Sequence, residues 1–261
     1  MDIVYLYAVL TGISVSAVST LFGLGGGIIM VPVLGMITPL SHLEIIATSL
    51  ATIVLVSMYN TFNYYRQHMI KWPVVPWIAG PSALFAFFSA ELSTHLDERI
   101  LILVFLLFLI FTAVRTLMLK DTGKEEHLTQ NRKRMIPFGI GMLSGMIASA
   151  TGIGGGGITT PLMLITGLVR NIQAAPTSNA IMVFTSLAAS ITYALSPFSS
   201  QLPYSVGYIH FDLTLFLFLG SLVFARFGYR WNKRLPLFWR KTVLGGILLI
   251  LCVRIFFVLI K

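Results

Sequence analysis

Two glycine-rich segments contain the residues of this sequence best suited to bind a ligand. The first, 23–32, reads GLGGGIIMVP, and the second, 152–161, reads GIGGGGITTP. Each lies between apolar runs, which is the pattern of a helix broken within a membrane. A helix that starts at such a break points unpaired N–H groups and the positive end of its dipole toward the break. Two such ends facing each other would make an anion-binding site.

We expect the anion to contact the backbone of both breaks and the polar side chains that begin the next helices. Glycine lets a ligand approach the backbone closely, and hydroxyl groups can donate to an anion's oxygens. The hydroxyls could equally cap their own helices, and the glycines could serve only helix packing. The expected substrate-binding residues are Gly25, Gly26, Gly27, Ile28, Thr48, Ser49, Gly154, Gly155, Gly156, Gly157, Thr159, Thr177, Ser178 and Asn179.

Other polar residues lie farther along the apolar runs. A group about three to four helical turns beyond the Thr-Ser pairs would line a path for the ligand or bond between helices. Two arginines near segment ends would reach the lipid headgroups or, turned inward, act as counter-ions. These pathway candidates are Asn60, Asn63, Tyr64, Tyr193, Arg115 and Arg254.

No arrangement of residues predicts catalysis. The sequence has no metal-ligand cluster, no Walker phosphate loop and no nucleophile paired with a base, so we expect no enzyme, no metal and no cofactor. The titratable residues Glu44, Glu91, His210 and Asp212 lie near segment ends. We therefore predict no proton relay deep in the helix bundle.

The composition identifies the solvent of this chain as a lipid bilayer. Of 261 residues, 56% are hydrophobic and 10% are charged, and the mean hydropathy is +0.87; soluble domains carry about 25% charged residues. The net charge of +9 then reflects membrane topology rather than nucleic acid binding. The single cysteine, Cys252, excludes a disulfide within the chain. Short loops and an N-terminus without a signal peptide favour a multi-pass protein of a prokaryotic inner membrane.

The order of the apolar segments predicts a duplication. An offset of 129 residues places Pro32 on Pro161 and Thr48 on Thr177, and an offset of 139 places Arg115 on Arg254. The predicted parts are a first membrane repeat (1–119), a polar cytoplasmic linker (120–136) and a second membrane repeat (137–261). The apolar runs are 3–22, 28–38, 43–65, 72–92, 100–119, 137–149, 158–166, 174–195, 211–227 and 243–260.

Loop charges predict how the repeats are oriented. If each broken segment enters and leaves on one side, then 14 of the 18 Lys and Arg residues share the side of the linker. If the broken segments cross the membrane, the basic stretch 226–241 lies opposite the linker, against the positive-inside bias. We therefore predict an all-α fold of two inverted repeats. Each repeat has a glycine-broken re-entrant helical hairpin and three transmembrane helices.

The doubled phrases resemble those of the sulfite exporter TauE/SafE family. Each is followed by a short Thr-Ser stretch, at 47–49 and 176–178, and the resemblance covers nearly the whole chain. It implies secondary transport of sulfite, thiosulfate, sulfoacetate or related organosulfonates, bound at the midplane and moved by alternating access. The second copy departs from the first by Gly157 and the Thr159-Thr160 pair, which predicts a site weighted toward the second half.

Two other functions stay open at this stage. An anion channel would use the same dipole-lined site, and a non-transporting membrane assembly factor would use the glycines for packing. The sequence leaves undecided the identity of the anion, the direction of transport and the coupling ion. It also leaves open whether the protein is a monomer or a homodimer.

Overall fold

The computed structural model describes residues 2–22, 25–118, 132–198, 204–234, 245–246 and 248–255. In these residues almost all regular structure is helical, as the composition predicts. The helices are α1 (Asp2–Phe22), α2 (Gly27–Ile37), α3 (His42–Tyr65), α4 (Val75–Thr94), α5 (Glu98–Met118), α6 (Arg132–Thr151), α7 (Gly156–Ile165), α8 (Asn171–Leu195) and α9 (Phe211–Arg234). Residues 248–255 are also helical.

Each predicted apolar segment corresponds to a helix, with two differences in detail. Helix α6 begins at Arg132, inside the predicted linker, whose residues 120–131 lie outside the described part of the chain. The loop before α9 contains a hairpin of β1 (Ser205–Val206) and β2 (Ile209–His210), which turns at Gly207 with a φ of +54°. The sequence pattern did not predict this hairpin, because each strand has only two residues.

Helix lengths separate membrane-spanning segments from shorter ones. Among the described residues, α3, α4 and α8 are long and apolar enough to cross a bilayer. Helices α2 and α7 have only 11 and 10 residues, so each covers about half of the hydrocarbon core. The short helices follow the glycine segments directly, as the predicted breaks require.

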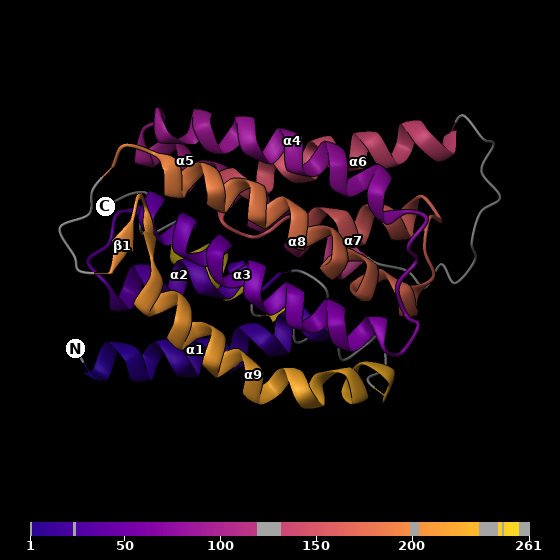
Figure 1. The fold of residues 1–261 in the computed structure, drawn as a ribbon, viewed down its shortest axis with the longest axis horizontal. Helices are drawn as coiled ribbons and strands as arrows, with labels where there is room; N and C mark the ends of the chain where they lie inside the picture. Colours follow the sequence, from indigo (N-terminus) through magenta and orange to yellow (C-terminus); the bar gives the residue numbers. More distant parts are fainter. Residues whose placement is uncertain are drawn as a thin grey trace.

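Helices α3 and α8 lie at the centre of the molecule and run in opposite directions (Figure 1). The N–H of His210, beyond the end of α8, donates to the hydroxyl of Thr48 near the start of α3 at 3.2 Å. In the same way the N–H of Lys71, beyond the end of α3, donates to the hydroxyl of Thr177 near the start of α8 at 3.1 Å. These two hydrogen bonds join equivalent positions of the sequence repeat, each from one half to the other.

The outer helices form two further equivalent pairs (Figure 1). Helix α9 packs along α1 on one side of the central pair, and α4 packs along α6 on the other. A Cβ on Gly12 of α1 would collide with the carbonyl of Leu217 in α9, and one on Gly141 of α6 would collide with the carbonyl of Ile78 in α4. The offsets of 129 and 139 relate these two contacts, so small residues permit close packing at the same place in each half.

Two buried tyrosines fix the ends of the helices that precede the glycine segments. The hydroxyl of Tyr64, near the end of α3, donates to the carbonyl of Thr20 in α1 at 2.8 Å. The hydroxyl of Tyr193, near the end of α8, donates to the carbonyl of Ser149 in α6 at 2.9 Å. Helices α1 and α3 therefore end side by side. The starts of α1 and α3 both lie near the start of α9, because Tyr5 of α1 bonds to Asp212 and Thr48 of α3 bonds to His210. Helices α1 and α3 therefore run in the same direction, so the chain must turn back through α2 between them.

We expect each of the substitutions Tyr64→Phe and Tyr193→Phe to lower the free energy of unfolding by about 1 kcal/mol. Each removes a donor from a buried carbonyl at the end of a helix. Thermal unfolding in detergent would measure the change. The matched control is Tyr65→Phe, whose side chain is exposed. Equal stability of all three variants would contradict the role assigned to the two bonds.

Candidate functional site

The two glycine segments meet between the repeats. A Cβ on Gly25 would collide with the carbonyl of Ile153, and a Cβ on Gly27 would collide with the carbonyl of Gly152. Gly25 and Gly154 both have a φ of +80°, a conformation that side chains disfavour. The backbones of the two turns are therefore in direct contact, and this contact requires glycine.

Both short helices start at this contact. Gly26 is the N-cap residue of α2 and Gly155 that of α7, and in the described structure no side chain caps either helix. The first N–H groups of each helix and the positive end of its dipole therefore lie at the junction of the turns. Gly157 packs against the ring of Phe108, and Ile28 is fully buried in the core. The structure thus brings together the predicted backbone groups, in tightly packed surroundings.

The predicted Thr-Ser hydroxyls hold the two halves together. Thr48 and Thr177 accept the equivalent bonds from His210 and Lys71, and the hydroxyl of Ser49 donates to the carbonyl of Gly152 at 2.8 Å. Ser178 is fully buried as well. In this conformation Thr48, Ser49 and Thr177 use their hydroxyls in bonds within the protein.

The amide side chains of Asn60 and Asn179 form a buried cluster with Ser19. The side-chain nitrogen of Asn60 donates to the side-chain oxygen of Asn179 at 3.2 Å and to the hydroxyl of Ser19 at 3.3 Å. The offset of 129 relates these residues to Leu50, Ala148 and Ala189, so the second copy of the cluster is apolar. The polar cluster therefore exists at one of two related positions, beside α1, α3 and α8.

The remaining predicted residues lie around this centre. Thr159 shares a 2.7 Å hydrogen bond with Ser144 and donates to the carbonyl of Gly155. Asn63 is half-buried on α3. The guanidinium of Arg254 donates to the carbonyl of Pro32 in α2 at 2.8 Å, so this arginine turns toward the broken helix. The side chain of Arg115 lies outside the described structure.

Four hydroxyls that the sequence analysis missed lie on the central helices. Ser57 and Thr61 of α3 correspond to Ser186 and Ser190 of α8 through the offset of 129. The side-chain oxygen of each is buried and has no hydrogen-bond partner among the described residues. The hydroxyl of Ser186 would lie 3.1 Å from a Cβ on Gly154, next to the glycine turn. The 129-residue offset between the two halves of the sequence identifies these pairs, because both members of each pair have a hydroxyl side chain.

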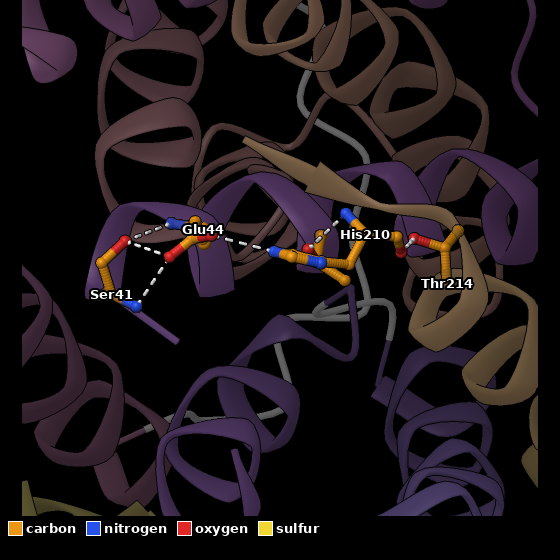
Figure 2. A network of polar contacts seen from close by, with 5 residues as sticks. Ser41, Glu44, His210 and Thr214 are labelled. Atoms are coloured by element: carbon orange, nitrogen blue, oxygen red, sulfur yellow. Dashed lines mark hydrogen bonds and ion pairs between the residues drawn. The ribbon is translucent and has the colours of Figure 1, made fainter. Parts of the chain in front are cut away.

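Two of the titratable residues that the sequence analysis located near segment ends form a buried pair there. Nε2 of His210 lies 3.0 Å from a carboxylate oxygen of Glu44, and both side chains are buried (Figure 2). The residues are 166 positions apart, so no local pattern could reveal the pair. In the part of the chain that the structure describes, no group of histidine, cysteine and acidic side chains could hold a metal ion.

Comparison with known proteins gives a consistent result. Residues 8–255 match the profile of the family described as Sulfite exporter TauE/SafE. A probable membrane transporter protein of Haemophilus influenzae is 26% identical over 261 residues, which covers 96% of this chain and 97% of the relative. A probable membrane transporter protein of Methanocaldococcus jannaschii is 24% identical over 247 residues, covering 92% and 91%. No solved structure is significantly similar to the chain.

We expect Gly27→Ala to destabilise the protein by about 1–3 kcal/mol, because the added Cβ would collide with the backbone of Gly152. The melting temperature in detergent would measure the effect. The control is Gly139→Ala in α6, where an added Cβ meets no atom within 4 Å and helix propensity favours alanine. If Gly27→Ala were as stable as this control, the glycine turns would not be in contact.

Proposed function

Because the chain belongs to the sulfite exporter TauE/SafE family, we propose that it is a secondary transporter of small sulfur-containing anions. It is a multi-pass membrane protein, and its family and curated relatives are membrane transporters rather than enzymes. The proposed substrates are sulfite, thiosulfate, sulfoacetate and related organosulfonates. The proposed membrane is a prokaryotic inner membrane, with linker 120–136 in the cytoplasm, where the positive-inside bias puts most Lys and Arg residues.

The observation that carries the proposal is the junction of the two glycine turns. It joins the starts of α2 and α7, which no described side chain caps, and lies beside the hydroxyl of Ser186, which has no partner among the described residues. A sulfite or sulfonate group has several acceptor oxygens and one or two negative charges. Backbone N–H groups and hydroxyls can donate to all of these oxygens without a buried cation. We place the anion between the turns, with Ser57 and Ser186 as donors from the two central helices.

The proposed mechanism is alternating access by two inverted repeats. It is supported by the antiparallel central helices and by the equivalent bonds of Thr48 and Thr177 to the opposite half. The backbone contact between Gly27 and Gly152 would close the site in one conformation. Movement of one repeat against the other would separate the turns and admit the anion. A closed contact of this kind favours a carrier over an open channel.

The test of this function is transport by the purified protein in liposomes. Sulfite, thiosulfate, sulfoacetate, isethionate and taurine would be added rapidly, with sulfate and acetate as controls, and current would be recorded. Counterflow of labelled sulfite would detect electroneutral exchange. Saturable transport of one or two sulfur anions is expected. A conductance that does not saturate would indicate a channel, and no transport together with no thermal shift would favour a packing role for the glycines.

We expect Ser57→Ala and Ser186→Ala each to weaken apparent affinity for the transported anion by about tenfold, the effect of one lost hydrogen bond to a charged group. Neither substitution should destabilise the protein, since each removes a buried hydroxyl that has no partner among the described residues. Flux against anion concentration, together with the melting temperature, would measure both effects.

The matched control is Ser14→Ala, because the exposed hydroxyl of Ser14 donates to the carbonyl of Leu10 in its own helix. This variant should transport like the original protein. Unchanged affinity in both Ser57→Ala and Ser186→Ala would exclude these hydroxyls from the site.

A further inference from the structure

A buried pair of titratable side chains connects α3 to the start of α9 (Figure 2). Nε2 of His210 and Oε1 of Glu44 are 3.0 Å apart, and the two side chains are 2% and 9% exposed. Glu44 belongs to the first turn of α3, and His210 ends β2. The pair therefore joins the first half to the second half at the end of the central helices where α3 begins.

The hydrogen bonds of Glu44 determine where the pair holds an added proton. Its second oxygen, Oε2, accepts from the N–H and the hydroxyl of Ser41, at 2.9 and 2.7 Å. Donors on both oxygens stabilise the ionised carboxylate. A proton taken up by the pair therefore resides on the imidazole of His210, and the net charge of the pair rises from −1 to zero.

The pair is linked to the glycine turns through two neighbouring residues of α3. The N–H of His210 donates to the hydroxyl of Thr48, and Ser49 donates to the carbonyl of Gly152. A negative charge on the pair disfavours an anion at the turns, and protonation removes this charge. By linkage, an anion at the turns must then strengthen proton binding by the pair to the same extent.

The pair occurs at only one of the two positions that the repeat relates. Offsets of 129 and 139 relate Glu44 to Gln173 and His210 to Lys71. Gln173 retains the capping contact, since its side chain accepts from the N–H of Arg170, as Glu44 accepts from Ser41. Helix capping therefore needs no carboxylate at the position of Glu44. Capping also does not explain why the imidazole of His210 faces that carboxylate.

A cavity of about 450 Å³ lies beside the loop that carries His210. Tyr208 forms part of its wall, and Glu91 and His95 also line it. Burial and the nearby carboxylate of Glu44 raise the pKa of Tyr208, which belongs to this cavity wall. The other titratable groups on the surrounding elements are Tyr193 of α8, Asp212 of α9 with its partner Tyr5 of α1, His42 of α3 and Glu98 of α5.

We propose that Glu44 and His210 form the proton-binding site that couples anion transport to the pH gradient, with one proton carried in the same direction as each anion. The inference rests on the proposed anion transport. In each cycle a proton from the aqueous phase binds the imidazole when the anion binds, and it leaves to the opposite phase when the anion is released. Downhill proton movement thereby drives uphill anion movement.

The experiment uses the purified full-length protein in liposomes that contain a pH-sensitive dye. The probe is thiosulfate, which stays fully ionised over the pH range used, so that any proton moved is carried by the protein. For the original protein, uptake of thiosulfate should acidify the lumen, and an inward proton gradient should drive accumulation. In His210→Gln, gradient-driven accumulation should fall about tenfold relative to counterflow, and the pH dependence of uptake between about pH 5 and 8 should disappear. Glu44→Gln should show the same loss.

The matched control is His95→Gln, because His95 also lies near a glutamate, Glu91, at 3.9 Å, but both side chains are exposed. This variant should keep the original ratio of accumulation to counterflow. The proposal is overturned if the original protein transports thiosulfate without moving protons, a result that does not depend on how the variants fold. It is also overturned if His210→Gln keeps its pH dependence. Absence of all anion transport by the original protein would instead contradict the proposed function.

Discussion

The structure depends on how a membrane protein satisfies the backbone of a broken helix. In hydrocarbon no water is present to bond to exposed N–H and carbonyl groups, so irregular backbone must be buried in protein or line a wet cavity. This chain places its two breaks against each other, with Gly27 on the carbonyl of Gly152 and Ser49 bonded to that same carbonyl. The tyrosine bonds to Thr20 and Ser149 fix the helices that lead into the breaks.

Around this shared core, the two halves differ in their polar residues. The framework contacts occur in equivalent pairs, whereas the cluster of Ser19, Asn60 and Asn179 and the pair of Glu44 and His210 each occur once. Their counterparts are apolar residues in the first case and Gln173 with Lys71 in the second. The contacts that occur in pairs therefore belong to the architecture that the two halves share, and the two unpaired clusters are where the halves differ chemically.

The sequence predicted the features that depend on local pattern or on register. Apolar run lengths located the helices, and the glycine phrases located the starts of α2 and α7. The offset of 129 could also have identified Ser57 with Ser186, which was overlooked because single serines in apolar helices are common. The contact of Glu44 with His210 could not be predicted, because it depends on the loop before α9 folding back over α3. Nor could the sequence reveal that Thr48 and Thr177 bond to the opposite half.

The hydrogen bonds of Thr48 and Thr177 to the opposite half also affect the order in which the chain can fold. The hydroxyl of Thr48 accepts a hydrogen bond from the N–H of His210. The ribosome must therefore synthesise about 160 further residues before this bond at the start of α3 can form. Until then the hydroxyl of Thr48 lacks the hydrogen bond that it accepts in the folded protein. The hydrogen bonds that join the two halves can therefore form only late in synthesis. A chain truncated before β2 would lack the partner of Thr48, however well its earlier helices had inserted.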